Sequence, residues 1–121
     1  MGARLIRIND EIFKELANIL RAELKDPRIN AMVSVVKVET TNDLKYCKIH
    51  VSVLGDEQQK KDVMSGLKNA NGFIRKLIAE RVNLRVTPEL TFVLDESLEY
   101  GMRMSKLIDE VNAPLRERAE E

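Results

Sequence analysis

The stretch MVSVVKVETTNDLKYCKIHVSV, from Met32 to Val53, decides the fold. Its first part is rich in valine, a β-branched residue that is enriched in strands, and predicts a strand from Met32 to Thr40. The side chains of residues 41–43 (Thr, Asn and Asp) are typical of tight turns. A second β-rich run follows, in which apolar residues alternate with polar ones. The two runs therefore predict a β-hairpin with one face buried and the other in solvent.

The alternation in the second strand separates two residues that could carry chemistry. Cys47 falls on the apolar face, where a thiol usually behaves as a small buried hydrophobe, whereas His50 falls on the polar face. No serine or carboxylate stands at a spacing that would make His50 a general base, and a histidine on such a face is usually solvated. We therefore expect no catalytic residues and no enzymatic activity.

Amphipathic helices are predicted on both sides of this hairpin. Before it, apolar residues recur at three- and four-residue spacing and predict a helix that ends near Lys25. After it, a helical rhythm starts near Val63 and continues to about Arg81. The sequence NANG at residues 69–72 interrupts that rhythm, because Asn and Gly are weak helix formers. We therefore predict two helices that meet at a kink or tight turn over residues 69–72.

The rest of the chain predicts one more strand and one more helix. Pro88 precedes an alternating run that ends at Leu94, and Ser97 begins a helical pattern that continues to Val111. The element order α, β, β, α, α, β, α predicts an α+β fold, with a mixed three-stranded sheet and helices on one face. Residues 1–112 are expected to form a single domain, and residues 113–121 a mobile charged tail.

The charges are balanced overall but are separated along the chain. Twenty Lys and Arg match twenty Asp and Glu, which gives a formal net charge of zero. Within residues 68–85, however, five positive charges face a single negative one, Glu80. Such a density is typical of a surface that meets phosphate, but a solvated helix face would produce it too. The five cations, which we expect to form one surface, are Lys68, Arg75, Lys76, Arg81 and Arg85.

Composition and spacing argue against most other chemistry. The single Cys excludes an internal disulfide, and the single His excludes a zinc site with several Cys and His ligands. The glycines do not have the spacing of a phosphate-binding loop, and adjacent carboxylates such as Asp95 and Glu96 point apart on a helix. No run approaches the ~18 apolar residues of a membrane span. We expect a cytoplasmic chain without metal, cofactor, membrane contact or small-molecule substrate.

The polar face of the sheet is the weaker candidate for an RNA-binding surface. A module that stacks bases on an open sheet needs aromatic side chains there. This face offers mainly charged, hydroxyl and histidine side chains, and Phe13 and Phe92 fit core positions. The pair of basic helices is therefore the better candidate surface.

The order of these elements, with a small-residue break between two helices that carry Lys and Arg, resembles the type II KH fold. Three segments also resemble the bacterial ribosome-binding factor A family in order and spacing, and the resemblance covers about residues 4–111. The segments are LKDPRI (Leu24–Ile29), VETTNDLKYCKIHVSVLG (Val38–Gly55) and LRVTPELTFVLDESLEYGMRMSKLID (Leu84–Asp109).

The resemblance implies a non-enzymatic assembly factor that binds the small (30S) ribosomal subunit. Such a factor assists late maturation of 16S rRNA, including its 5′ end, and growth in the cold. The family replaces the Gly-x-x-Gly loop of ordinary KH domains with Ala-x-Gly, which Ala70, Asn71 and Gly72 match. Because a Gly-x-x-Gly loop clamps single-stranded RNA, its absence favours binding to structured rRNA through shape and phosphate contacts. The expected RNA-binding residues are Lys68, Asn69, Ala70, Asn71, Gly72, Arg75, Lys76, Arg81 and Arg85.

Gly72 is expected to be sensitive to substitution for one of two reasons. A larger side chain would either strain the backbone at the bend or block the close approach of RNA. A purely structural helix break without RNA contact is the alternative for this residue.

A second functional class stays open beside the assembly factor, which we expect to be a monomer. Residues 91–121 carry eight acidic against four basic side chains, so the chain could act as a protein-interaction module through an acidic C-terminal helix. Steep salt dependence of binding to 30S subunits or 16S rRNA would separate the two classes. A small hydrolase or transferase is disfavoured, because no nucleophile and base are placed together.

Overall fold

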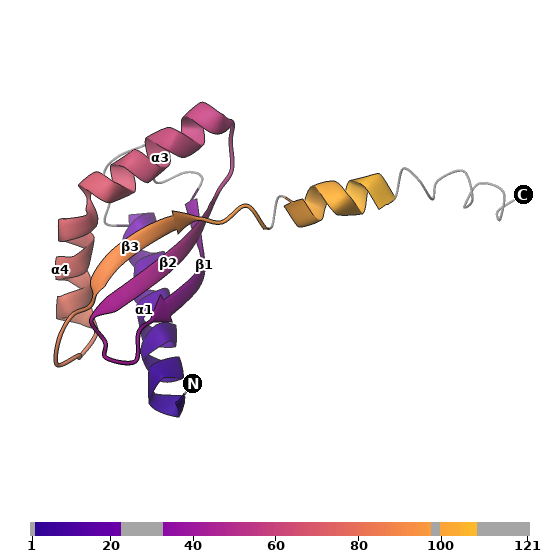
Figure 1. Ribbon diagram of the computed structural model, residues 1–121. Coiled ribbons are helices and arrows are strands. Elements are labelled where there is room, and N and C mark those ends of the chain that lie inside the picture. Colours follow the sequence, from indigo (N-terminus) through magenta and orange to yellow (C-terminus); the bar gives the residue numbers. More distant parts are fainter. Residues whose placement is uncertain (1, 23–32, 98–99, 109–121) are drawn as a thin grey trace, which may run out of the picture.

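The computed structural model describes residues 2–22, 33–97 and 100–108 (Figure 1). Residues 100–108 are helical and follow the last strand. The chain therefore has an α+β fold with a three-stranded sheet, as its sequence predicts. Its labelled elements are α1 (Ala3–Ala22), β1 (Val33–Thr40), β2 (Tyr46–Val53), α3 (Glu57–Asn69), α4 (Asn71–Arg81) and β3 (Glu89–Leu94).

The sheet is mixed, as predicted, because the central strand has neighbours of opposite direction. β1 pairs with β2 antiparallel, and β3 pairs with β2 parallel. The antiparallel pair is closed by a short turn, whereas the parallel pair needs a long crossover connection. Helices α3 and α4 form this crossover and lie on the β3 side of the sheet, while α1 lies behind the sheet (Figure 1).

The core lies between the helices and one face of the sheet. The predicted alternation in β2 is confirmed from Tyr46 to Val51, where buried residues alternate with more exposed ones, but Ser52 is buried as well. Complete burial of one Ile or Leu side chain stabilises a fold by roughly 1.5–3 kcal/mol, so the apolar residues of the core supply much of the driving force for folding. Buried side chains of this core include Cys47, Ile49, Val51 and Val53 from β2, Ile12, Leu16 and Ile19 from α1, and Leu67, Ile74 and Ile78 from α3 and α4.

A β-bulge in β1 is not apparent from the sequence pattern. The register of β1 against β2 shifts between Val35 and Lys37, so Val36 is the extra residue, and it is 41% exposed. In an unbroken strand, Val35 and Val38 would point to opposite faces. The bulge lets both side chains pack on the same core and thereby keeps the valine-rich strand on the sheet.

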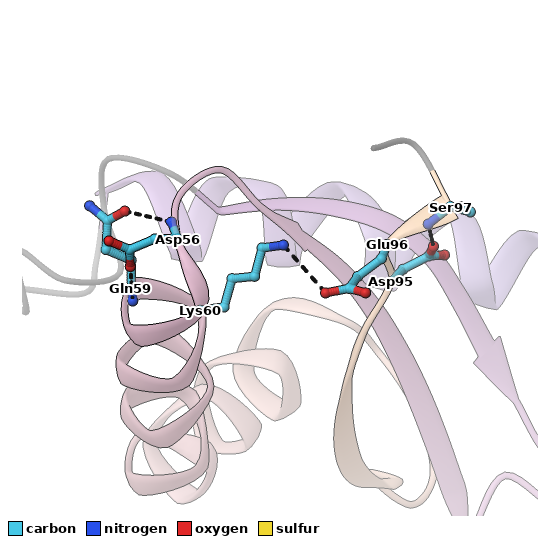
Figure 2. Close-up of polar contacts among 6 residues, drawn as sticks. All are labelled: Asp56, Gln59, Lys60, Asp95, Glu96 and Ser97. Atoms are coloured by element: carbon cyan, nitrogen blue, oxygen red, sulfur yellow. Dashed lines mark hydrogen bonds and ion pairs between the residues drawn. The ribbon is translucent and has the colours of Figure 1, made fainter. Parts of the chain in front are cut away.

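The chain that leaves β3 is held against the start of α3 (Figure 2). Lys60 is 7% exposed, and its Nζ donates a hydrogen bond to Glu96 Oε1 at 3.3 Å. Asp95 Oδ1 accepts a hydrogen bond from the backbone N–H of Ser97 at 2.8 Å. Beyond these contacts, helical residues 100–108 are all exposed and extend away from the sheet (Figure 1).

Some of the expected boundaries lie outside the described residues. These are the end of the first helix near Lys25, the end of the last helix at Val111, and the division between domain and tail at residues 112 and 113. They stay predictions.

Two glycines beside the helices differ in what their backbone requires. Gly55 has a φ of +148°, a region that favours glycine, and a Cβ there would collide with the side chain of Gln59. Gln59 is itself fixed, because it completes a capping box with Asp56 at the start of α3 (Figure 2). Gly72 has no positive φ, and a Cβ there would meet nothing within 4 Å. The expectation of backbone strain at Gly72 is therefore wrong, and the constrained glycine is Gly55.

Alanine substitution should consequently have opposite effects at these two positions. We expect Gly55→Ala to lower the free energy of unfolding by about 1–3 kcal/mol, because a non-glycine residue is strained there. Gly72→Ala should raise the free energy of unfolding by up to about 1 kcal/mol, since Ala is the better helix former. Denaturant unfolding of the two variants and the wild type measures both effects. A Gly55→Ala protein as stable as the wild type would contradict the assigned conformation.

The single cysteine provides an internal probe of unfolding. Cys47 is 1% exposed, and Thr40 Oγ1 lies 3.6 Å from its Sγ. Burial raises the pKa of the Cys47 thiol, which disfavours the reactive thiolate. We predict that an aromatic disulfide reagent labels the native protein only as fast as the chain opens, and that denaturant accelerates labelling. Rapid stoichiometric labelling without denaturant would show that the thiol is accessible in the native state.

Candidate nucleic-acid interface

The two basic helices meet where the sequence predicts. α3 ends at Asn69 and α4 begins at Asn71, so Ala70 alone joins them. The N–H of Ala70 donates to the carbonyl of Gly66 at 2.9 Å, and its carbonyl accepts from the N–H of Ile74 at 2.9 Å. One residue therefore belongs to the hydrogen-bonding patterns of both helices and fixes their junction.

The exposed residues of this junction include two lysines, a glycine and the neighbouring Asn69 and Phe73, of which Phe73 is 48% exposed. Lys68 near the end of α3, and Gly72 and Lys76 of α4, are exposed. Gly72 and Lys76 are four residues apart and therefore share one face of α4. Neither lysine side chain has a hydrogen bond or ion pair within the described part of the chain. The junction thus presents free positive charge beside a position without a side chain, which suits the approach of a phosphate backbone.

Asn71 and Arg75, two of the expected RNA-binding residues, contact β3 and the segment before it. Arg75 Nε donates to the carbonyl of Pro88 at 3.2 Å, and its Nη2 donates to the carbonyl of Thr87 at 2.8 Å. Asn71 Nδ2 donates to the carbonyl of Leu90 at 2.9 Å. β3 is an edge strand, so its outward carbonyls need partners from outside the sheet. Both side chains therefore have a role in the fold.

Arg81 leaves α4 in another direction. Its Nη1 lies 3.7 Å from Glu15 Oε2, and this ion pair joins the end of α4 to α1. Arg75 and Arg81 are six residues apart, which places them roughly 240° apart around the helix. The structure therefore directs these two of the five cations toward different neighbours and leaves Lys68 and Lys76 at the junction.

Arg85 lies in the loop between α4 and β3. The residue is exposed, whereas its neighbour Leu84 packs against the core. Arg85 is therefore presented to solvent from a loop that is attached on its inner side.

The open face of the sheet carries a charged cluster. Glu39 Oε1 accepts a hydrogen bond from Lys37 Nζ at 2.7 Å, and Glu39 Oε2 lies 3.6 Å from His50 Nε2. The bond from Lys37 is the main reason that the pKa of Glu39 is lowered. His50 is half-buried rather than solvated, and its Nε2 has no hydrogen-bond partner among the described residues. The imidazole thus faces a carboxylate, so the expectation that no carboxylate lies near His50 is wrong: the pairing of β1 with β2 brings Glu39 to it.

Sequence reasoning missed one exposed aromatic residue on this open face. Tyr46 begins β2 and is 56% exposed, on the same side of the strand as Lys48. The alternation with buried Cys47 could have placed it there. Because Tyr46 directly follows the turn, the sequence pattern did not show that it belongs to the strand.

The described ranges offer neither a metal cluster nor a membrane span. In residues 2–22, 33–97 and 100–108, no three Cys, His, Asp or Glu side chains are grouped so that they could hold a metal ion. None of the helices described in these ranges combines the length and apolar character needed to cross a membrane.

These features define a small α+β domain whose candidate site is a cationic helix junction. Residues 4–108 match the family Ribosome-binding factor A. Ribosome-binding factor A of Lachnospira eligens is 63% identical over 105 residues, which cover 87% of this chain and 81% of that protein. The protein of the same name from Agathobacter rectalis is 55% identical over 112 residues, or 93% of each chain. The chain belongs to the ribosome-binding factor A family.

Solved structures show the same fold. The crystal structure of ribosome-binding factor A from Thermus thermophilus matches with a TM-score of 0.66 and 23% identity, over 74% of this chain and 93% of that one. A homology model of the Thermus thermophilus factor, fitted into the cryo-EM map of a 30S complex, matches with a TM-score of 0.60 and 24% identity, over 73% and 91%. A putative ribosome-binding factor A from Thermotoga maritima matches with a TM-score of 0.53 and 29% identity, over 74% and 81%.

Proposed function

We propose that this chain is a cytoplasmic, monomeric assembly factor that binds the 30S ribosomal subunit. It assists late maturation of 16S rRNA, including processing of its 5′ end, supports growth in the cold, and catalyses no reaction itself. The observation that carries this proposal is the family match over residues 4–108. The 30S complex of the Thermus thermophilus factor supports the choice of subunit.

The helix junction is the proposed RNA contact. A chain with a formal net charge of zero has no general attraction for RNA, so a local group of free cations must supply it. Lys68 and Lys76 are such cations, and Arg85 is a third exposed one. Asn69, Ala70 and Gly72 provide polar and small surface between them, whereas Asn71, Arg75 and Arg81 hold the helices in place. Each phosphate that a cation neutralises releases counterions and makes binding sensitive to salt.

Reversal of the two junction lysines tests this surface. We predict that Lys68→Glu with Lys76→Glu weakens binding to purified 30S subunits by on the order of 10-fold or more at ~0.1 M salt, and flattens the dependence of affinity on salt. Lys14→Glu on α1 is the control, because this lysine is exposed and lies outside the junction. Fluorescence anisotropy at several salt concentrations gives the affinities. Equal affinities for the double variant and the control would contradict the proposed surface.

Both reversals should leave the fold intact, since exposed charges contribute little to stability. Thermal unfolding of each variant checks this point. A lower affinity with an unchanged melting temperature then reports on the interface itself.

The maturation role is tested in cells. Depletion of the chain should lead to accumulation of 16S rRNA with unprocessed 5′ ends, more strongly in the cold. The wild-type gene should restore processing, whereas the gene with both lysines reversed should not. Primer extension measures the 5′ ends, and normal 5′ ends in depleted cells would contradict this role.

The alternative function is a protein-interaction module that acts through the C-terminal helix. The described part of this helix exposes apolar side chains, including Tyr100 and Leu107, which favours a protein partner. Its charges are Arg103 and Lys106, and the acidic residues that follow lie outside the described residues. Binding that persists at high salt and requires this helix would favour the alternative. Binding to isolated 16S rRNA that falls steeply with salt would favour the assembly factor.

A further inference from the structure

We propose that Arg75 is a positioning residue that fixes the place of Arg85, and that Arg85 rather than Arg75 contacts an RNA phosphate. This inference rests on the proposed function. It gives different roles to two arginines that the charge pattern alone treats alike.

The loop Val82–Pro88 is anchored at both ends and at one residue in between. Val82 and Pro88 are buried at its two ends, and Leu84 packs against the core. Arg85 and Val86 lie between these anchors and are exposed. The loop therefore projects one cation, and the contacts on either side of it decide where that cation stands.

Arg75 supplies the contact on the C-terminal side of Arg85. Its Nε and Nη2 donate to the carbonyls of Pro88 and Thr87, at 3.2 and 2.8 Å. The planar guanidinium presents these two donors side by side, which matches two successive carbonyls. A lysine would keep the charge but has a single nitrogen at the end of a flexible chain, so it cannot hold both carbonyls in this way.

Neighbouring contacts extend the same attachment into β3. The N–H of Glu89 donates to the carbonyl of Lys45 at 2.8 Å, and Asn71 Nδ2 holds the carbonyl of Leu90. Four consecutive residues, 87–90, are thus fixed from α4 and from the hairpin. Arg85 stands two residues before this fixed segment and directly after the anchored Leu84.

An ordered loop favours binding. Fixing the backbone of one residue costs roughly 1–2 kcal/mol in conformational entropy. A loop that is already ordered in the free protein does not lose this entropy when it meets RNA. Arg75 therefore promotes phosphate binding by Arg85 without touching the phosphate.

A double-mutant cycle on the full chain separates positioning from direct contact. We expect Arg75→Lys and Arg85→Gln each to weaken 30S binding by about 5- to 10-fold at ~0.1 M salt, the size expected for one lost phosphate contact. The protein with both changes should bind no more weakly than Arg85→Gln alone, because Arg75 acts through Arg85. Combined with Lys68→Gln, which lies on α3, Arg75→Lys should instead be additive.

Several results would overturn the inference. Wild-type affinity and salt dependence in Arg75→Lys would mean that its charge alone matters, as for a phosphate ligand. Additive losses in Arg75→Lys with Arg85→Gln would mean that the two arginines act independently. A purely structural role of Arg75 would weaken binding to the same degree with and without Arg85, so it also predicts additivity.

Hydrogen exchange in the free protein makes the inference testable apart from the proposed function. Arg75→Lys should accelerate amide exchange at Glu89, whereas Lys68→Gln should leave it unchanged. Unchanged exchange in Arg75→Lys would refute the positioning role whatever the protein binds. If Arg75→Lys accelerates exchange but the wild-type protein shows no affinity for 30S subunits, the proposed function is refuted while the role of Arg75 in holding the loop stands.

Discussion

The pairing of β2 with two strands of opposite direction is the constraint on which the other elements depend. An antiparallel neighbour can follow through a short turn, as β2 follows β1, but a parallel neighbour requires the chain to return along the sheet. α3 and α4 make that return, and both pack on the core face. The helix junction at Ala70 is therefore a consequence of the parallel pairing, and so is the position of the cations around it.

The same topology explains why the arginines of α4 are not all free. β3 is added at the edge of the sheet, where unpaired carbonyls carry a free-energy penalty unless a donor reaches them. From α4, Asn71 reaches a carbonyl of β3 and Arg75 reaches two carbonyls directly before it. Arg81 connects the far end of α4 to α1 through Glu15. Arginine suits these places because its fork satisfies paired acceptors. Lys68 and Lys76, which can bind as flexible point charges, stay in solvent.

The features that the sequence could predict are those with a local signal in the chain. The alternation around Cys47 revealed the central strand, and the NANG segment revealed the helix break, because both signals are local. The bulge at Val36 could not be predicted, because valines occupy both odd and even positions of β1. The sequence of this strand therefore does not show which side chains face the core, and the register depends on the partner strand. The constrained glycine is Gly55 rather than Gly72, because φ is set by the surrounding chain and not by the residue type. The contacts of Arg75 with the carbonyls of Thr87 and Pro88 could not be predicted, because a count of charges does not show where each side chain points.

The small number of cations on the proposed surface limits how strongly phosphate contacts alone can hold RNA there. Lys68 and Lys76 lie at the junction and Arg85 lies in the loop after α4, and at ~0.1 M salt each phosphate contact contributes roughly a tenfold gain through counterion release. Three contacts of this kind give roughly a thousandfold gain, which is less than typical non-specific binding to nucleic acid provides. Selective binding to one particle must therefore draw on shape, since phosphate contacts carry no sequence information and structured RNA is recognised largely by its surface. Recognition by shape requires a protein surface that is itself rigid. The rigidity of the junction and of the loop that carries Arg85 is therefore important for selective binding.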